Sequence, residues 1–97
     1  MGYKAGYDIS TGISNVFVGF EAGLDCDTAN NNVGIGASAL KAGTGAANCV
    51  AVGKGSLIAN GNGIENTAVG ASSLATNTIG EKNIGIGFQA GYGITGD

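Results

Sequence analysis

The sequence predicts an all-β protein, a parallel β-solenoid in which each 17-residue repeat forms one coil of strand, glycine and turn. Three observations support this prediction. A glycine recurs every 17 residues, and a short run of alternating apolar residues precedes it. Segments rich in Asn, Gly, Thr and Ser fill the rest of each repeat, as expected of turns. The recurring glycines are Gly2, Gly19, Gly36, Gly53, Gly70 and Gly87.

The repeats cover nearly the whole chain without an insertion. After Met1, five full repeats span 2–18, 19–35, 36–52, 53–69 and 70–86, and a partial sixth spans 87–97. A length of 97 residues suits one domain, so we expect a single solenoid domain over 2–97. Each repeat is numbered below from its glycine, which takes position 1, so that Val18 stands at position 17 of the first repeat.

The strand is expected just before each glycine. Positions 15 and 17 are apolar, except for Thr67 at position 15, and they alternate with position 16, which is the period of a strand of three or four residues. We expect these alternating side chains to form the core, stacked in ladders with coils about 4.8 Å apart. The predicted core residues are Val16, Val18, Val33, Ile35, Val50, Val52, Val69, Ile84 and Ile86.

Glycine and asparagine are expected to form structural ladders along the stack. The glycine at position 1 ends the strand and permits a left-handed or crowded backbone. Position 14 holds Asn15, Asn32, Asn66 and Asn83, and Cys49 interrupts this series. The asparagines have two interpretations, a ladder of side-chain amides or a local turn residue with a positive φ.

Two further patterns follow the same period. Position 2 is aromatic wherever position 5 is glycine, and non-aromatic wherever position 5 is leucine. The two side chains could compete for one volume, or the repeats could belong to two inherited subtypes. Opposite charges share position 3 in Lys4 and Glu21, and position 13 in Glu65 and Lys82, so stacked coils would bring each pair together.

Composition excludes several classes of function. The four Lys, the absence of Arg and the net charge of −3 disfavour nucleic-acid binding. No apolar stretch is long enough for membrane insertion, and no signal peptide follows Met1. Without histidine, and with serines and threonines that lack a base, the chain is not expected to be an enzyme. We expect Cys26 and Cys49 to be free thiols.

No cofactor or metal is expected. The segment 91–96, "GYGITG", matches the dinucleotide fingerprint only formally, because no long strand precedes it and no helix follows. Asp8, Asp25 and Asp27 could hold Ca²⁺, but exposed turn aspartates are the favoured interpretation. Aromatic residues gather in the first and last repeats, where they could bind a receptor or sugar, fill the ends of the core, or form chain contacts. The candidates for end contacts are Tyr3, Tyr7, Phe88 and Tyr92.

Units such as "NVGIGASAL", "NTAVGASSL" and "NIGIGFQAGYGITG" resemble the head repeats of YadA-type trimeric autotransporter adhesins and the repeat regions of phage tail fibres. This resemblance covers 2–97 and implies a left-handed parallel β-roll, with three chains side by side in a fibre. The head repeats of that adhesin family are somewhat shorter than 17 residues, and the chain shows no stalk, anchor barrel or chaperone domain.

The expected function is that of a structural or adhesive fibre module on a cell surface or virion, which projects from that surface or contacts a host or cell surface. The expected partner is another copy of the chain, in homotrimers or end-to-end filaments, and a receptor or glycan is a second possible partner. The alternative is a ligand-binding solenoid face for polysaccharide or ice, or a self-assembling extracellular filament subunit. A face for ice would need a regular array of threonines, whereas the threonines here are scattered.

Overall fold

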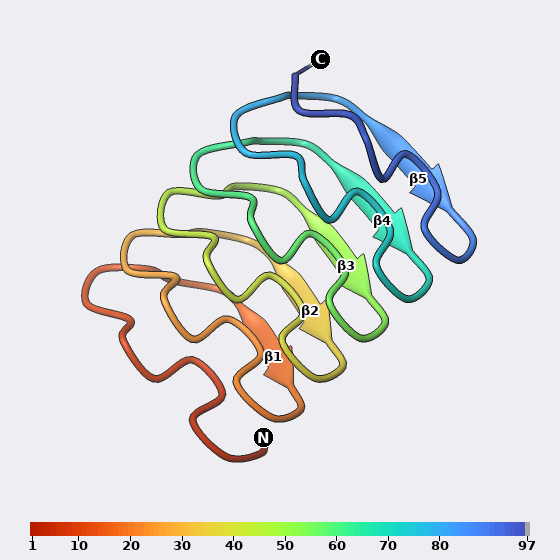
Figure 1. Cartoon of the computed structure of the whole chain (residues 1–97). Helices are drawn as coiled ribbons and strands as arrows, with labels where there is room; N and C mark the ends of the chain where they lie inside the picture. Colours follow the sequence, from red (N-terminus) through yellow and green to blue (C-terminus); the bar gives the residue numbers. More distant parts are fainter. Residues whose placement is uncertain (97) are drawn as a thin grey trace.

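The chain folds into a parallel β-solenoid (Figure 1). A computed structural model describes residues 1–96, and Asp97, the last residue of the expected partial repeat, lies outside them. Within residues 1–96 there is no helix, and the five strands have three residues each. They are β1 (Val16–Val18), β2 (Val33–Ile35), β3 (Val50–Val52), β4 (Thr67–Val69) and β5 (Ile84–Ile86). The predicted all-β parallel solenoid is therefore confirmed.

The sequence period sets the register of the sheet. Val16 pairs with Val33, Val33 with Val50, Val50 with Thr67, and Thr67 with Ile84, so that each strand is offset by one repeat. The sheet order follows the chain order, β1 to β5, and each coil lies on the preceding one (Figure 1). Because residues at the same repeat position are neighbours, every repeat position becomes a row along the stack.

Backbone hydrogen bonds join the coils outside the strands as well. The Gly36 N–H donates to the Val18 carbonyl at 2.7 Å, and the Leu40 N–H donates to the Ser56 carbonyl at 2.9 Å. On the opposite turn, Ala47 forms isolated parallel bridges with its neighbours one coil away on either side. Since each coil is bonded to the next around most of its circumference, the backbone ladder stabilises a chain that has few large side chains.

The predicted core is wrong in its orientation. Only the middle residue of each strand points inward, as Phe17, Ala51 and Ala68 do, while both flanking residues point outward. Alternation in a three-residue strand places two side chains on one face and one on the other, and here the pair faces outward. Val16, Ile35, Val69, Ile84 and Ile86 are exposed, whereas Val18, Val33, Val50 and Val52 are half-buried.

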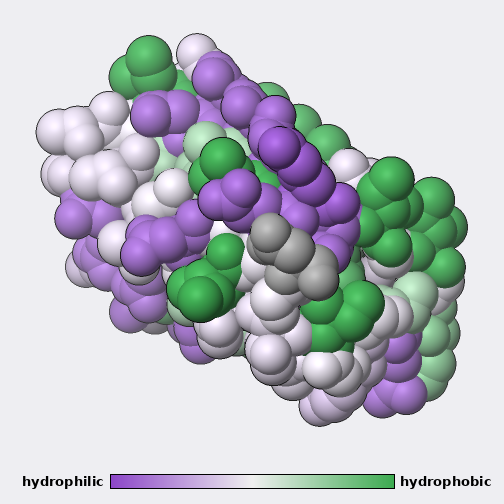
Figure 2. All heavy atoms as spheres, turned by 90° about the horizontal axis from the view of Figure 1, so that it is seen from above, coloured by the Kyte–Doolittle hydropathy of each residue, from purple (hydrophilic) through white to green (hydrophobic). Residues whose placement is uncertain are grey.

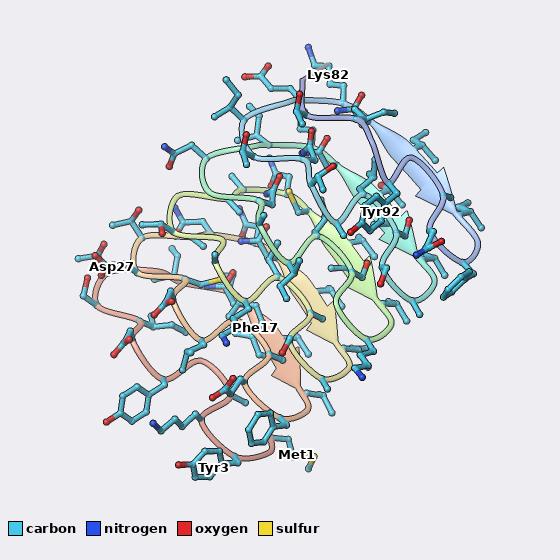
Figure 3. All side chains as sticks on the ribbon, in the orientation of Figure 1. Met1, Tyr3, Phe17, Asp27, Lys82 and Tyr92 are labelled. Atoms are coloured by element: carbon cyan, nitrogen blue, oxygen red, sulfur yellow. The ribbon has the colours of Figure 1, made fainter. Side chains whose placement is uncertain are left out.

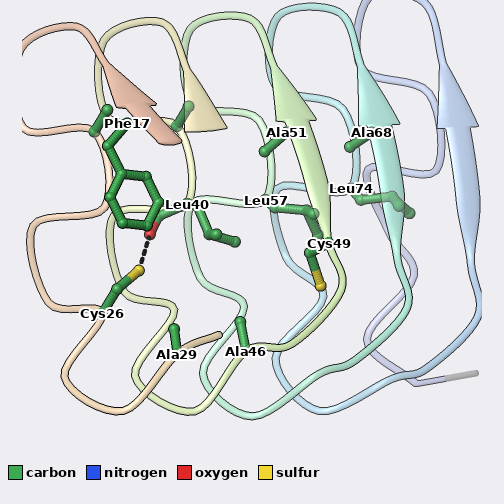
Figure 4. Packing of buried hydrophobic residues seen from close by; sticks show 12 residues of the cluster. Phe17, Cys26, Ala29, Leu40, Ala46, Cys49, Ala51, Leu57, Ala68 and Leu74 are labelled. Atoms are coloured by element: carbon green, nitrogen blue, oxygen red, sulfur yellow. Dashed lines mark hydrogen bonds between the residues drawn. The ribbon is translucent and has the colours of Figure 1, made fainter. Parts of the chain in front are cut away.

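The returning segment of each coil fills the interior instead. Leu40, Leu57 and Leu74, at position 5, are fully buried in the third, fourth and fifth coils (Figure 4). In the second coil position 5 is Gly23, and a Cβ there would lie 2.5 Å from the Phe17 ring. The Phe17 ring therefore takes the volume that leucine fills elsewhere in the stack.

This packing corrects the proposed competition between positions 2 and 5. The aromatic residues at position 2, Tyr3, Phe20 and Phe88, are all exposed, so they do not occupy the space of the buried leucines. The exchange of glycine for leucine at position 5 is compensated by Phe17 in the first two coils. The structure gives no direct contact that would explain why position 2 varies with it.

The glycines at position 1 are required by close contact between coils. Their φ angles lie between 114° and 130°, a region that side chains disfavour. A Cβ at Gly53 would lie 2.6 Å from the carbonyl carbon of Gly70, and four other glycines of the row are similarly crowded. Gly87 is the exception, since no atom of residues 1–96 lies within 4 Å of its Cβ direction. The row thus allows the backbones of successive coils to approach.

Candidate functional site

The outer face of the sheet is an apolar feature of the surface. It consists of two rows of side chains, from positions 15 and 17 of β1 to β5, and nine of the ten are Val or Ile. Five of them are between 37% and 73% exposed. Figure 2 shows apolar residues gathered along its right-hand side, the side of the strands in Figure 1. We call these ten residues the valine face; its polar member is Thr67.

Folding of a single chain leaves the apolar surface of the valine face exposed to water. Burial of apolar surface contributes about 25 cal/mol per Å², so exposed Val and Ile side chains are a lost source of stability. Monomeric proteins rarely expose contiguous apolar patches of more than a few hundred Å², and larger patches mark interaction sites. Within a single chain, these side chains favour strand formation, but none of the ten is fully buried.

The asparagine row forms a ladder that links side chains to the backbone of the next coil. The Asn32 carboxamide oxygen accepts the Cys49 N–H at 2.8 Å, and its nitrogen donates to the Ala46 carbonyl at 2.9 Å. In the same way, the Asn66 carboxamide oxygen accepts the Asn83 N–H, and its nitrogen donates to the Gly80 carbonyl. The positive φ angles fall one residue earlier, at position 13, so the turn interpretation applies to that position instead. Direct bonding between amides of this row is present from Asn32 to Asn15.

A second set of asparagines lies inside the stack, and sequence reasoning missed it. Asn60 and Asn77, at position 8, are fully buried, and Asn77 donates to the Asn60 side-chain oxygen at 2.9 Å. Asn66 donates to the same oxygen at 3.1 Å. No buried side-chain nitrogen or oxygen of the described residues lacks a partner. A satisfied polar network of this kind fixes the register of the coils. The signal available in the sequence was the 17-residue spacing of these two asparagines.

Aromatic residues are exposed at both ends of the stack (Figure 3). The rings of Tyr3 and Phe20 are stacked with centroids 5.3 Å apart, and the Lys4 ammonium lies 5.4 Å from the Tyr3 ring and 5.0 Å from the Tyr7 ring. Phe88 and Tyr92 are exposed at the other end. The predicted end contacts are thus accessible, and their role in contacts between chains stays a prediction.

A surface hollow of about 440 Å³ lies beyond the carboxyl ends of the strands, toward the C-terminal end of the stack. Phe88 and Tyr92 line one side of it, and Lys54 and Ile58 contribute from two coils away. Its charged lining residue is Lys54. This volume lies within the range of roughly 300–1,000 Å³ that is typical of small-molecule sites.

The acidic residues do not pair as the sequence predicts. Lys41, and not Lys4, forms an ion pair with Glu21 at 3.1 Å, while Lys4 lies over the tyrosine rings. The two expected pairs within a row are not among the ion pairs of residues 1–96. The neighbouring Asp25 carboxyl raises the pKa of the Asp8 carboxyl, because a hydrogen bond between the two favours the protonated form and the Asp25 charge opposes ionisation. Asp27 accepts a hydrogen bond from the Ser10 hydroxyl.

Both cysteines are buried free thiols, as expected. The Cys26 thiol donates to the Leu40 carbonyl at 3.3 Å, and burial raises its pKa to about 12. Burial also raises the pKa of Cys49. Because the thiolate is the nucleophile, neither group is prepared for catalysis or redox chemistry at neutral pH.

Comparisons with protein-family models, curated proteins and solved structures find no match to this chain. The described part of the chain also contains no helix of the length and apolarity that crossing a membrane requires. The features that carry a functional argument are therefore those of the fold itself, namely the valine face, the exposed aromatic ends and the hollow.

Proposed function

We propose that this chain is a rigid structural or adhesive fibre module that associates with further copies of itself. The valine face carries the proposal, because it exposes two regular rows of branched apolar side chains on a sheet held by backbone ladders. The fibre would project from a cell surface or virion, or contact another surface, in the extracellular environment that the resemblance to adhesin and tail-fibre repeats implies.

Another copy of the same chain fits the valine face because of its period. Side chains on this face recur once per coil, so the grooves between coils have the same spacing as the ridges of a second copy. Sheets that pack face to face are about 10 Å apart and interdigitate their side chains. We favour three copies side by side, the homotrimer that the resemblance implies, over end-to-end filaments through the aromatic ends.

The backbone ladder supplies the mechanical property that a fibre needs. Hydrogen bonds between coils run along the stack axis, so extension of the rod would require breaking several of them together. The chain has few long flexible side chains at the surface, with 11% charged residues. We propose a geometric role of this kind in preference to catalysis.

The valine face is tested by replacing its exposed side chains with threonine, which preserves β-branching and strand propensity. A variant with Val16→Thr, Ile35→Thr, Val69→Thr and Ile84→Thr is compared with the unmodified chain by light scattering at micromolar concentrations. We expect trimers for the unmodified chain and monomers for the variant, with the β-sheet circular dichroism signal retained in both. A matched control changes Ile13→Thr and Ile79→Thr, two exposed isoleucines away from the strands, and should still assemble.

Two outcomes would reject the proposal. One is a stable, monodisperse monomer of the unmodified chain at micromolar concentration. The other is an equal loss of assembly in the control variant, since that would mean general surface hydrophobicity and not the valine face. Persistent long filaments in the threonine variant would favour end-to-end association, and charged substitutions at Tyr3 and Phe88 should then shorten the filaments.

A further inference from the structure

The hollow arises from the pattern of residues at position 2. This position is aromatic in Tyr3, Phe20 and Phe88, but the three coils between hold Ala37, Lys54 and Ala71. Ala71 and the buried Ala75 form part of the lining of the hollow. Small side chains in the middle of the row, with Phe88 beyond them, therefore leave an open space of about 440 Å³.

The walls of the hollow differ in chemistry. Phe88 and Tyr92, which are 74% and 47% exposed, supply aromatic surface. Ser38 and Ser72 stand at position 3, two coils apart, which corresponds to about 10 Å along the stack. Their hydroxyl groups make no hydrogen bond within residues 1–96, so both can bond to a ligand.

Lys54 gives the hollow its charge. Its ammonium is exposed and forms no ion pair within the described part of the chain, in contrast to Lys41, which pairs with Glu21. Among residues 1–96 no acidic residue lines the hollow, although the chain as a whole carries a net charge of −3. A positive group in an otherwise uncharged hollow favours a ligand with one negative charge.

We propose that this hollow binds a carboxylated pyranose sugar. The C–H groups on one face of a pyranose ring carry partial positive charge, which suits the negative face of the Phe88 and Tyr92 rings. Sugar hydroxyls match the free hydroxyls of Ser38 and Ser72, and the carboxylate matches Lys54. Hexuronates and sialic acids share this chemistry, and the volume of the hollow accommodates one or two rings.

Other ligands fit the hollow less well. Nucleotides and polyphosphates carry several charges, which a single lysine on a chain of net charge −3 does not balance. A purely apolar ligand would make no use of the Lys54 charge or of the Ser38 and Ser72 hydroxyls. The inference goes beyond self-association, because the hollow lies past the carboxyl ends of the strands and does not include residues of the valine face.

The test is a titration of the full chain with sodium glucuronate, N-acetylneuraminate, glucose and acetate, followed by ligand-detected and protein-detected NMR. We expect saturable binding of at least one of the two carboxylated sugars, and binding of glucose and of acetate at least about threefold weaker. The relative affinity of glucuronate and N-acetylneuraminate identifies the kind of acidic sugar. No saturation by either sugar, or equal binding of glucose or acetate, would overturn the proposal.

Variants locate the site. Lys54→Gln should weaken binding of the carboxylated sugar about three- to tenfold, and should leave glucose binding nearly unchanged. Phe88→Leu keeps the apolar character but removes the aromatic face, and should weaken binding as well. Lys82→Gln removes the same charge from an exposed position on another turn, and should have no effect. An equal loss with Lys82→Gln would mean a general charge effect and would reject the site.

Assembly is measured on every variant, so that failure of this site is distinguishable from failure of the proposed function. Light scattering should give the same mass for Lys54→Gln and the unmodified chain. Normal assembly without sugar binding would reject the site and leave the fibre module intact. Sugar binding by a chain that remains monomeric would support the site and reject the proposed self-association.

Discussion

Three buried leucines adopt a backbone conformation that leucine normally avoids. Leu40, Leu57 and Leu74 have φ angles of 53°, 49° and 50°, and each is fully buried. The left-handed conformation costs roughly 1–2 kcal/mol for a residue with a side chain. Burial of a leucine side chain contributes about 1.5–3 kcal/mol, so burial offsets the strain. Glycine, which avoids the strain, stands at the same position in Gly6, Gly23 and Gly91.

Leu57 therefore provides an unusual comparison of alanine with glycine. Leu57→Ala should destabilise the fold by about 2–5 kcal/mol, because it creates a cavity and retains the strain. Leu57→Gly creates a slightly larger cavity but removes the strain, and we expect it to be no less stable than Leu57→Ala in urea unfolding. Ala68→Gly, within β4, is the control and should cost about 0.5–1 kcal/mol. If Leu57→Gly were less stable than Leu57→Ala by the same amount, about 0.5–1 kcal/mol, this account would be contradicted.

The pair of Asp8 and Asp25 makes stability depend on pH. A hydrogen bond with Asp25 in the protonated form, and the Asp25 charge, raise the pKa of Asp8 in the folded state. A raised folded pKa means that the favourable contribution is present below the unfolded pKa, and is lost as pH rises through the folded pKa. At neutral pH the two carboxylates repel each other.

Asp8→Asn should consequently raise the melting temperature at pH 7 and have little effect at pH 3. Circular dichroism melts at the two pH values, with protein concentration held equal, measure this difference. Glu65→Gln removes a charge from an exposed turn elsewhere and serves as the control for net charge. A stabilisation by Asp8→Asn that was as large at pH 3 as at pH 7 would exclude carboxylate repulsion as its cause.

Four of the five strands, β2 to β5, face the interior with their smallest side chain, and β1 does so with Phe17. Residues at position 16 are Phe17, Gly34, Ala51, Ala68 and Gly85, and all five are buried. The leucines of the returning segment fill the space opposite them, so that the distance between the two walls of a coil admits one large side chain. The width of the coil thus limits the size of the strand side chains that point inward. The branched Val and Ile residues of the strands point outward.

Ala51→Val tests this limit, because valine has the higher strand propensity but adds volume inside the coil. Ala51 is fully buried between Gly34 and Ala68 of the adjacent strands. We expect Ala51→Val to destabilise the fold by about 1–3 kcal/mol in urea unfolding. Ile13→Val removes a methylene from an exposed side chain outside the strands and should change the stability by less than about 0.5 kcal/mol. A stabilising Ala51→Val would mean that the interior has unfilled volume.

The sequence was sufficient for the fold but not for the direction of its side chains. A 17-residue period without insertions determines the parallel register, because any other offset between coils would place different repeat positions next to each other in every row. The period cannot distinguish the inner from the outer face, since Val-x-Val alternation is the same for both. Interior packing depended on Phe17, whose ring substitutes for leucine across coils, and a single residue leaves no periodic signal.

The candidate sites were predictable to different degrees. The exposed aromatic ends follow directly from where Tyr3, Tyr7, Phe88 and Tyr92 stand in the chain. The sequence does not predict the hollow, because it forms where position 2 lacks an aromatic side chain, and because its lining comes from several coils. The valine face was recognised as a set of residues but assigned to the core, which is the reverse of its position.

Close backbone contact at one row of glycines holds successive coils together. Gly53→Ala would place a Cβ 2.6 Å from the Gly70 carbonyl carbon, in a backbone with a φ angle of 127°. Gly87→Ala has a similar φ angle of 117°, but no atom of the described part of the chain lies near its Cβ. We expect Gly53→Ala to cost at least about 2 kcal/mol more than Gly87→Ala in urea unfolding, because only Gly53→Ala must separate two coils. If Gly53→Ala and Gly87→Ala destabilised the fold equally, the positive φ angle alone would account for the loss of stability.

The stack is nearly one-dimensional, because each coil contacts the coils directly before and after it. Such proteins are stabilised by the sum of their coils and of the interfaces between neighbours, so the end coils open more readily than the middle. The two thiols report on this gradient. Cys26 lies in the second coil, one coil from the N-terminal end, and Cys49 lies in the third.

We expect both thiols to resist a disulfide reagent at pH 8 without denaturant, because burial raises their pKa values, that of Cys26 to about 12. At that pKa roughly one Cys26 in ten thousand is a thiolate at pH 8. With urea below the unfolding midpoint, Cys26 should react several times faster than Cys49, as read by mass spectrometry of the labelled peptides. Opening of the first coils exposes Cys26, whereas Cys49 needs the middle of the stack to open. Identical labelling rates for the two thiols at every urea concentration would show that all the coils open together, and that stability is not distributed along the stack.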